Sequence, residues 1–598
     1  MRKPPRIVAL VLAAGYSSRM GCFKPLAPLG TSTLIEVAVT RFLRAGIEDV
    51  RVVVGHRADE LTPVLDHLGI KWIFNAQYDS GMFSSVLAGL KSFEPDVDAF
   101  FLLPCDIPLV NSHTIRALLS VYNLDCPKII YPRFNGERGH PPLIPAAYLN
   151  EDLSPDYPGG LPALLGSYEP NAVDMDVADE NILLDCDTPS DYRILVESRS
   201  RESIPTEAEC EAVCSRFKVS EQVIAHSMVV AELARTLAAL LNSTGLALDL
   251  PLIIAAGRLH DIARGQPDHA GVGSKLITEM GYPRVGAVVA KHMDIQSRGP
   301  SVDEADLVYF ADKCVEEDRI VSLDERFERS MSRYADRPDI LKKIVRRFDE
   351  ARNIGKRIEA LLGCPVDNMV RRYERSIRAA SMGSRRAIYL VRHGAIQSPV
   401  DPKRFIGQLD LPLTEEGFLQ AERLAEGLRD TPLSAVFCSD LKRSVQTAQI
   451  IAKPHHISCI PRRELREISL GRWEGLTFDE VRRRHPEEFH ARGLDIVHFR
   501  PDEGESFLDC TFRVIPAFYE TLTSTRGNIL IVGHAGVNRI ILSQALGRSL
   551  ADLFEIDQEY GCLNVLAHRH SALEVKLLNG SPSDLKRFQS ELNRETNC

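Results

Sequence analysis

The N-terminal stretch MRKPPRIVALVLAAGYSSRMGCFKPLAPLG (residues 1–30) decides how the first third of the chain folds. A basic start followed by the apolar run from Ile7 to Ala14 is typical of a secretory signal peptide. The same residues also fit a buried β-strand that opens into a loop carrying Arg19 and Lys24. We favour the strand, because polar and charged sequence resumes directly after the run and later motifs require the loop.

Length and composition indicate a folded protein of several domains. With 598 residues and a prior of about one domain per 150, we expect three or four domains. The net charge of −10 argues against a general affinity for nucleic acid. The 13 cysteines show no short paired spacing, so we expect a reduced, cytoplasmic compartment. No apolar run approaches the ~20 residues that cross a bilayer, so we expect no membrane association.

The patterning changes twice along the chain and predicts a multidomain α/β protein with three domains. Residues 1–198 alternate buried strands with helices, which predicts a doubly wound, mostly parallel sheet. Residues 199–382 have helical periodicity, as in QVIAHSMVVAELARTLAALL, and predict an all-α bundle with a helical connector. Residues 383–598 return to an α/β pattern. The expected strands are RIVALVLAAG, DVRVVVGH, KWIFN, DAFFLLPCD, KIIYPRF, AIYLV, AVFCS and NILIVG.

The loop after the first strand is a candidate phosphate site. Consecutive backbone N–H groups in such a turn suit an anion, and Arg19 and Lys24 supply cations for a triphosphate. The candidate nucleotide-binding residues here are Leu12, Ala13, Ala14, Gly15, Ser17 and Ser18. Alone this is a weak signal, since a glycine after a strand also marks an ordinary tight turn.

Four later stretches make the signal specific: NAQYDSGMFSSVLAGL, LLPCDIPLV, RGHPPLIP and LLDCDTPSDY. Together with the loop, over most of residues 6–195, they resemble the nucleotidyltransferases of molybdenum-cofactor maturation, which have a nucleotide-diphospho-sugar-transferase-like fold. The Leu-Ala-Ala-Gly sequence is closer to the cytidylyltransferases, because guanylyltransferase relatives usually have a second glycine where this chain has Ala14. The resemblance implies CTP and a molybdopterin-like phosphorylated acceptor.

The resemblance also assigns roles to individual residues. Asp106 would hold Mg²⁺ against the triphosphate, and Asp187 would complete the metal site, with Asp185 as the alternative second ligand. Gly81, Ser84 and Ser85 would approach the base or sugar, and His140 the acceptor. Phe23 and Pro25 flank Lys24 at positions where smaller residues are common in the family, so the identity of the acceptor substrate stays open.

The helical region contains an ordered series of potential metal ligands, namely His226, His260, Asp261, His269, His292 and Asp312. Imidazole and carboxylate ligands suit Fe, Mn or Zn. The motifs HSMVV, GRLHDIARG and YFADKCV resemble the HD phosphohydrolase superfamily, which binds metal at the centre of a helical bundle. His269 and His292 fall where two-metal members place extra histidines. The resemblance implies one or two metal ions and phosphate-ester hydrolysis.

Four motifs of the last region, LVRHGAIQ, SDLKRSVQTA, LREISLGRWEG and GHAGVNR, resemble the histidine phosphatase superfamily, which is phosphoglycerate mutase-like. Arg392 and Arg443 would bind phosphoryl oxygens together with His534. His393 would attack phosphorus, and Glu467 would protonate the leaving oxygen. No metal is expected, since the cations balance the phosphate charge. GQLDLPLTEEG and PDEGESF look most like the α-ribazole phosphatase branch.

The leading hypothesis is a multifunctional enzyme of cofactor assembly that joins CTP-dependent nucleotidyl transfer to two hydrolytic activities. An alternative is cobamide nucleotide-loop assembly, with GTP-dependent guanylyl transfer and an α-ribazole phosphatase. In a third hypothesis the HD domain senses a nucleotide and regulates its neighbours. We expect small-molecule phosphate partners and a possible homo-oligomer.

Overall fold

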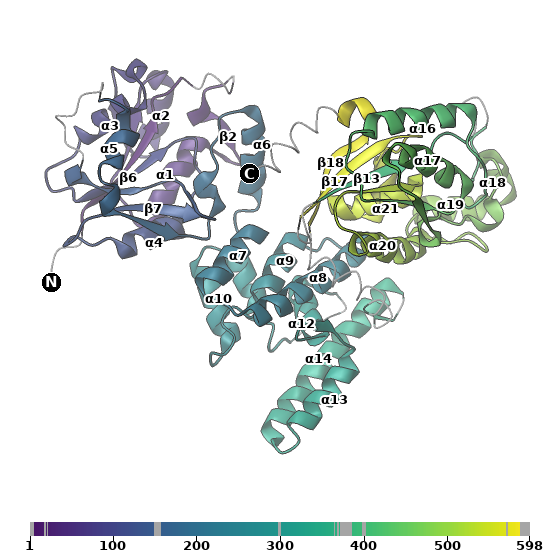
Figure 1. Ribbon diagram of the computed structural model, residues 1–598. Coiled ribbons are helices and arrows are strands. Elements are labelled where there is room, and N and C mark those ends of the chain that lie inside the picture. Colours follow the sequence, from purple (N-terminus) through teal and green to yellow (C-terminus); the bar gives the residue numbers. More distant parts are fainter. Residues whose placement is uncertain are drawn as a thin grey trace. The chain divides into compact units, whose positions relative to one another are not determined.

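The computed structural model describes residues 5–16, 20, 22–148, 157–296, 299, 301–363, 365, 366, 370, 386–396, 402–569 and 572–585. The chain divides into two compact units (Figure 1). Unit 1 contains Met1–Ser220 and Leu259–Ala290, and unit 2 contains Glu221–Arg258 and Lys291–Cys598. The helical region therefore contributes to both units.

The N-terminal sheet confirms the predicted doubly wound architecture. Its strand order is β10-β7-β9-β6-β1-β4-β5, and β8 pairs with β7. At its centre β1 lies parallel to both β4 and β6, whereas β9 is antiparallel to β6 and β7. The strands are β1 (Ile7–Ala13), β4 (Val50–Val54), β5 (Lys71–Phe74), β6 (Ala99–Pro104), β7 (Ile129–Phe134), β8 (Glu137–Arg138), β9 (Leu143–Pro145) and β10 (Ala172–Asp176). The N-terminal apolar run is therefore a central strand, as expected.

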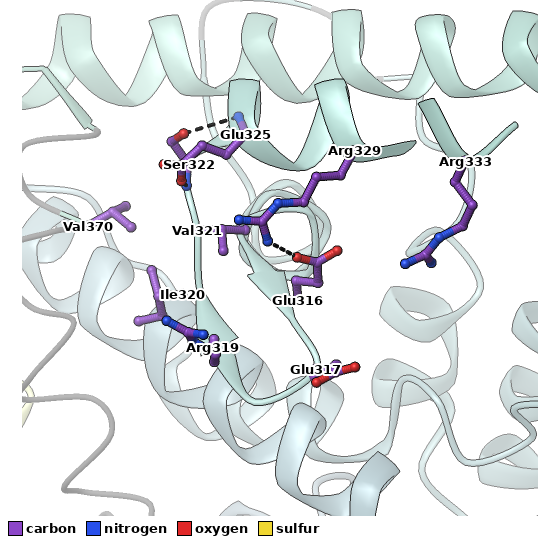
Figure 2. Close-up of a pocket in the computed structure, with 10 residues that line it drawn as sticks. All are labelled: Glu316, Glu317, Arg319, Ile320, Val321, Ser322, Glu325, Arg329, Arg333 and Val370. Atoms are coloured by element: carbon purple, nitrogen blue, oxygen red, sulfur yellow. Dashed lines mark hydrogen bonds and ion pairs between the residues drawn. The ribbon is translucent and has the colours of Figure 1, made fainter. Parts of the chain in front are cut away.

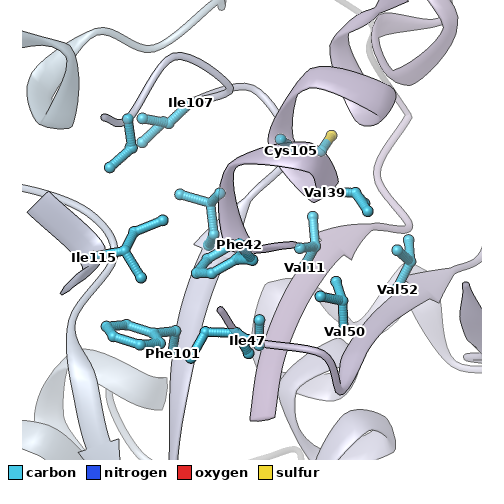
Figure 3. Close-up of a cluster of buried hydrophobic side chains, with 14 of the residues drawn as sticks. Val11, Val39, Phe42, Ile47, Val50, Val52, Phe101, Cys105, Ile107 and Ile115 are labelled. Carbon is cyan, nitrogen blue, oxygen red and sulfur yellow. The ribbon is translucent and has the colours of Figure 1, made fainter. Parts of the chain in front are cut away.

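Side chains of the central strands alternate between two hydrophobic clusters. From β1, Ala9 and Val11 enter one cluster and Leu10 enters the other. Figure 3 shows the first cluster, where Phe42 of α1 packs on Phe101 of β6 with ring centroids 5.7 Å apart. Because both faces are covered, the strands read as nearly continuous apolar runs.

Helices flank this sheet and extend unit 1 into the helical region. They are α1 (Leu34–Ala45), α2 (Ala58–His67), α3 (Met82–Leu90), α4 (Ser112–Val121), α5 (Gly160–Gly166), α6 (Pro189–Ser200), α7 (Glu207–Arg216), α10 (His269–Glu279) and α11 (Pro283–Val289). Helix α1 begins with a capping box, in which Thr33 and Glu36 satisfy each other's backbone N–H groups.

The helical part of unit 2 is built on α8 (Glu221–Ser243), α12 (Glu304–Lys313), α13 (Leu323–Arg333) and α14 (Pro338–Leu362), and α9 spans Leu250–Leu259. A short hairpin of β11 (Val315–Glu316) and β12 (Arg319–Ile320) interrupts the helices and was not predicted. By length and composition α8 is apolar enough to cross a membrane, which the sequence analysis overlooked, yet 72% of its apolar window is buried inside the protein. A core helix passes the same test, so this is weak support for a membrane span.

The C-terminal sheet has the order β15-β14-β16-β13-β17-β18. The first four strands are parallel neighbours, while β17 and β18 are antiparallel. The strands are β13 (Arg386–Arg392), β14 (Ala435–Ser439), β15 (Cys459–Arg462), β16 (Ile529–Gly533), β17 (Leu563–Arg569) and β18 (Ala572–Gly580). The helices are α16 (Glu415–Leu428), α17 (Lys442–Ala452), α18 (Phe478–Arg484), α19 (Pro486–Leu494), α20 (Phe507–Thr523) and α21 (Ala535–Leu546). The predicted strands of this region are all present.

Candidate active sites

Two adjacent parallel strands bring the two C-terminal histidines together. Arg392 at the end of β13 lies in register with Gly533 at the end of β16. The next residue of each strand is a histidine, and the rings of His393 and His534 are 5.0 Å apart between centroids. Both histidines are buried. The site thus lies at the carboxyl ends of the strands, where open α/β sheets hold ligands.

Hydrogen bonds fix which nitrogen of His393 is available for chemistry. Its Nδ1 lies 2.8 Å from the carbonyl oxygen of Gly394, which can only accept, so Nδ1 carries the proton. Its Nε2 then holds a lone pair, and the Arg443 Nε–H points at it from 3.2 Å. The same Arg443 Nε lies 3.3 Å from Nδ1 of His534. One guanidinium therefore contacts both imidazoles.

Arg443 is held rigidly by the loop that precedes α16. Its two terminal nitrogens donate to the carbonyl oxygens of Leu409, at 2.5 Å, and Gly407, at 2.7 Å. The side chain is buried, and α17 supplies it close to its first turn. Burial lowers the pKa of Arg443, although Glu467 opposes that change. The loop GQLDL thus positions a cation beside His393.

Burial and neighbouring cations keep both imidazoles neutral. Burial lowers the pKa of His393 well below its ordinary value, and the charges of Arg443 and Arg392 lower it further. Burial likewise depresses the pKa of His534, with Arg443 as the next cause. A neutral His393 with its lone pair on Nε2 is the form that can act as a nucleophile.

Backbone groups orient Glu467 toward the same site. Its carboxylate accepts hydrogen bonds from the backbone N–H groups of Ile468, at 2.9 Å, and Gly536, at 3.0 Å. Arg513 of α20 donates to the carbonyl oxygen of Glu467 at 2.9 Å. These bonds fix the carboxylate next to the start of α21. Sequence analysis missed Arg513, because a single arginine in a helix carries no distinguishing pattern.

Arg392 is oriented by another residue that the sequence analysis missed. Its guanidinium carbon lies 3.8 Å from the ring centroid of Tyr560, and its Nη1 donates to the carbonyl oxygen of Gln558 at 2.6 Å. Tyr560 also packs against His393, with centroids 5.6 Å apart. The structure thus brings together all five residues predicted for this site, namely Arg392, His393, Arg443, Glu467 and His534.

In unit 1, three residues predicted for the nucleotidyltransferase site converge at the carboxyl edge of the sheet. Lys24 Nζ lies 2.6 Å from Asp187 Oδ1 and 3.5 Å from Asp106 Oδ2. Asp106 follows β6, and Asp187 precedes the capping box of α6. Burial raises the pKa of Asp106, against the opposing charge of Lys24. Asp185 as the alternative ligand stays a prediction. Burial lowers the pKa of His140, and the charges of both Asp106 and Asp185 oppose that change.

The remaining predicted residues of this site are only partly placed. Leu12, Ala13 and Ala14 are buried at the end of β1, and Gly15 follows them. Ser17, Ser18 and Arg19 lie outside the described residues.

Gly81 is the N-cap of α3, and the buried hydroxyls of Ser84 and Ser85 accept hydrogen bonds from Asn75 at 2.8 and 3.0 Å. These two serines therefore fix the loop before α3, and their approach to a base stays a prediction.

Three predicted metal ligands lie in unit 2, and two of them face each other. His226 Nδ1 is 2.7 Å from the carbonyl oxygen of Glu317, so the proton lies on Nδ1. His226 Nε2 lies 3.2 Å from Asp312 Oδ1, an acceptor to which Nε2 donates a hydrogen bond when it is protonated. Two electron-pair donors at this separation suit a shared cation, and the Glu317 carbonyl supplies the outer hydrogen bond common at metal-binding histidines. His292 is also buried, and its carbonyl oxygen accepts from Lys313 at 3.2 Å.

The other three predicted ligands lie in unit 1. Asp261 Oδ2 lies 3.6 Å from His260 Nε2, and Asp261 Oδ1 lies 3.4 Å from His269 Nε2. Arg264 also contacts Asp261 at 2.9 Å. His260 is fully buried, whereas His269 begins α10 and is partly exposed. One carboxylate thus lies between two imidazoles, which is a donor set that suits a first-row metal.

A cavity of about 590 Å³ lies beside the β11–β12 hairpin, as Figure 2 shows. Arginine and glutamate side chains line it in equal number, and Arg329 pairs with Glu316. The full lining is Glu316, Glu317, Arg319, Ile320, Val321, Ser322, Glu325, Arg329, Arg333 and Val370. Since the charges balance, the cavity favours no ligand of one sign.

Three family models match successive parts of the chain. Residues 9–170 match the MobA-like NTP transferase domain, residues 223–353 the HD domain, and residues 388–581 the histidine phosphatase superfamily, branch 1. The order is that of the three resemblances drawn from the sequence motifs.

Individual relatives match the C-terminal region. The adenosylcobalamin/alpha-ribazole phosphatase of Salmonella typhimurium is 32% identical over 198 residues, which cover 32% of this chain and 95% of that protein. The 6-phosphofructo-2-kinase/fructose-2,6-bisphosphatase of Caenorhabditis elegans is 35% identical over 174 residues, which cover 29% of this chain but only 36% of that protein. The alpha-ribazole phosphatase structure from Shigella flexneri is 28% identical and covers 32% of this chain and 96% of its own, with a TM-score of 0.31. By its C-terminal region the chain belongs to the histidine phosphatase superfamily, and it carries MobA-like NTP transferase and HD domains before that region.

Proposed function

We propose that the C-terminal domain is a phosphatase that transfers a phosphoryl group to His393 without a metal ion. His393 Nε2 forms a bond to phosphorus while the bond from phosphorus to the leaving oxygen breaks, and Glu467 gives that oxygen a proton. Water then attacks phosphorus, the bond to Nε2 breaks, and Glu467 takes a proton from the water. Arg392, Arg443 and His534 balance the charge of the phosphoryl oxygens.

One observation carries this proposal: the hydrogen bond from His393 Nδ1 to the Gly394 carbonyl leaves Nε2 unprotonated beside Arg443. The depressed pKa of His393 supports the same protonation state. A phosphoryl oxygen entering the site would take over the Arg443 Nε–H and leave the lone pair free to attack.

A labelling experiment tests this phosphatase. With a substrate labelled in its phosphate, we expect acid-labile, base-stable label on the protein, trapped best in Glu467→Gln when the leaving group is good. His393→Ala removes both the label and turnover. If label persists in His393→Ala, the nucleophile is another residue, and His534 is the first candidate.

For the N-terminal domain we propose nucleotidyl transfer from CTP to a phosphorylated, molybdopterin-like acceptor. The pair of carboxylates around Lys24 supports this, because two acids facing one ammonium leave an excess of negative charge for a cation. Asp106 and Asp187 would hold Mg²⁺, which when bound balances the charge of a triphosphate. Lys24 would contact the phosphates.

Pyrophosphate release with each of the four nucleoside triphosphates tests nucleotide choice. We expect CTP to be preferred and Asp106→Ala to lose release. The cobamide alternative predicts GTP instead, and the similarity of the C-terminal region to an alpha-ribazole phosphatase is the observation that favours it. Release unchanged in Asp106→Ala contradicts the metal assignment.

For the HD domain we propose metal-dependent phosphate-ester hydrolysis at one or two Fe, Mn or Zn ions. The paired donors His226 and Asp312 support it, as do Asp261 and its two histidines in unit 1. Elemental analysis of the full chain grown with all three metals tests it, and a metal-free preparation would refute it. If metal binds but no ester is hydrolysed, the sensor alternative gains support. The combined reading is a cytoplasmic enzyme of cofactor assembly, with a possible homo-oligomeric state.

A further inference from the structure

The cavity beside His393 holds more positive charge than one phosphate needs. It has a volume of about 240 Å³, and five arginines line it against a single carboxylate, that of Glu467. Arg392 and Arg443 serve the transferred phosphoryl group in the phosphatase proposed above. Arg404 donates to the carbonyl oxygen of Gly475 at 2.9 Å and lies 3.9 Å from Glu480. Among the described residues, Arg492 and Arg539 form no ion pair, although the charges of Glu467 and Asp557 act on Arg539.

Arg492 is held by aromatic rings rather than by acids. It belongs to α19, and its guanidinium carbon lies 5.6 Å from the ring centroid of Phe405 and 5.9 Å from that of Phe554. Within the described part of the chain it makes no ion pair or side-chain hydrogen bond, and no carboxylate there opposes the lowering of its pKa by burial.

Arg539 approaches the same ring from another helix. It lies on α21, its guanidinium carbon is 5.3 Å from the centroid of Phe554, and its Nε donates to the carbonyl oxygen of Ile556 at 2.7 Å. Among the described residues, the other guanidinium nitrogens of Arg539 have no hydrogen-bond partner. Burial also lowers the pKa of Arg539, with the charge of Arg392 as the next cause.

We propose that Arg492 and Arg539 form a second oxyanion subsite in this cavity. The preferred substrates are phosphate monoesters whose leaving group carries a further phosphate, phosphonate or carboxylate. A planar guanidinium matches these oxyanions with two parallel hydrogen bonds, and an anion offsets the cost of holding two partly buried charges. The aromatic wall of Phe405 and Phe554 fits a leaving group with an apolar or planar body. This inference rests on the proposed phosphatase for its reaction but not for its binding step.

Three matched substrates test the subsite in the full chain: benzyl phosphate, 4-carboxybenzyl phosphate and 4-(phosphonomethyl)benzyl phosphate. Each has one phosphate ester that can be cleaved, and millimolar EDTA silences the proposed metal-dependent HD hydrolase, so release of inorganic phosphate reports the His393 site. Hydrogen bonds to charged groups contribute about 1.5–3 kcal/mol, so we expect kcat/KM to be ~10- to 100-fold higher for the charged substrates. No preference for the charged substrates overturns the proposal. A preference only for the phosphonate identifies phosphate as the natural second group, and equal preference identifies an oxyanion in general.

Variants separate binding from packing. Arg492→Gln and Arg539→Gln should each lower the ratio of charged to uncharged kcat/KM ~10-fold, whatever the absolute rates. If both rates fall by one factor and the ratio stays, the arginine only packs on the rings and the subsite is refuted. Arg423→Gln, an exposed arginine of α16, is the matched control and should keep the wild-type ratio.

A binding arm keeps the test independent of catalysis. If the protein hydrolyses none of the three esters, the proposed phosphatase fails while the subsite is still testable by calorimetry. We then expect 1,4-bis(phosphonomethyl)benzene to bind ~10-fold more tightly than benzylphosphonate, and Arg492→Gln to remove the difference. Equal affinities in the wild-type chain overturn the subsite.

Discussion

The imidazoles of His393 and His226 are oriented in the same way, but the side chains that their Nε2 atoms face have opposite charges. In both, Nδ1 donates to a backbone carbonyl, that of Gly394 or that of Glu317, and Nε2 faces a charged side chain. At His393 the lone pair of Nε2 faces the guanidinium of Arg443, across 3.2 Å. At His226 Nε2 faces the carboxylate of Asp312, also across 3.2 Å.

The difference in partner separates two kinds of phosphate chemistry. A lone pair beside a fixed cation attracts the oxygens of a phosphoryl group, which brings phosphorus to the nitrogen. A carboxylate beside the nitrogen repels such oxygens, and carboxylate and imidazole together attract a metal ion. The carbonyl that fixes the imidazole is therefore common to both sites, and the residue facing Nε2 decides between nucleophile and ligand.

The largest effect is expected at the nucleophile. His393→Ala should lower phosphatase turnover by ~10⁴-fold or more, since removing the nucleophile of a catalytic triad costs about 10⁶-fold in kcat. Phosphate release from 4-nitrophenyl phosphate measures it. EDTA at millimolar concentration should leave the wild-type rate of this reaction unchanged. A chelator-sensitive rate that His393→Ala does not alter would assign the activity to the HD domain.

The second-largest effect is expected when the general acid is removed. The size of that effect depends on the leaving group of the substrate. For an alkyl phosphate, Glu467→Gln should reduce kcat by ~10³-fold, because proton transfer to the leaving oxygen contributes 10²–10⁴-fold. With 4-nitrophenyl phosphate the first-turnover burst of nitrophenolate should be slowed far less, since nitrophenolate leaves without a proton, while steady-state turnover still falls because Glu467 also accepts the proton of the attacking water. Equal losses in the phosphorylation rate with both esters would show that Glu467 orients the site rather than donating a proton.

At the HD site the expected effect is on metal content. His226→Ala and Asp312→Asn should each weaken metal binding by ~100-fold or more, because loss of an outer-shell partner alone costs 10–100-fold. Metal per chain after dialysis measures it. His498→Gln, an exposed histidine paired with Asp495, is the control and should keep the wild-type content. Unchanged metal in both site variants would show that the pair is only a buried hydrogen bond.

The sequence predicted the sheets and the strand-end residues for a physical reason. Strands such as Ile7–Ala13 and Ile529–Gly533 are buried on both faces, so they read as apolar runs. A residue that directly follows such a strand lies at the carboxyl edge of the sheet. Two of the strands that end there are neighbours in the sheet. His393 and His534 could therefore be paired from sequence, as could Asp106 with the opening loop.

Other parts of the sites could not be predicted, because they depend on long-range packing or on the backbone. The Glu317 carbonyl that orients His226 lies in a two-residue hairpin without a sequence signal. Arg492 looks like one more solvated arginine of a polar helix, and only the tertiary fold places it against Phe405 and Phe554. Tyr560, which stacks on Arg392, is similarly unmarked in the sequence.

The smallest effect is a pH dependence of stability caused by the two neutral histidines of the phosphatase site. The pKa values of His393 and His534 are depressed in the folded state, while an unfolded chain has histidines with a pKa of about 6.5. Below pH ~6.5 the unfolded state binds more protons than the folded state, so the free energy of unfolding falls as the pH falls. Each histidine contributes a slope of at most ~1.4 kcal/mol per pH unit.

The buried Trp473 can report this slope, because the only other tryptophan of the chain is Trp72, which is 42% exposed. In a Trp72→Phe background, urea unfolding followed by fluorescence at pH 5.5 and 7.0 in phosphate-free buffer gives the change in unfolding free energy. We expect His393→Gln to remove about half of the site's contribution, so that its stability depends less on pH than that of the parent. Equal pH dependence in the two proteins would mean that His393 is protonated in the folded state, and a protonated Nε2 cannot attack phosphorus. The histidine facing Arg443 would then be a phosphate-binding cation, and the distinction drawn here between His393 and His226 would fail.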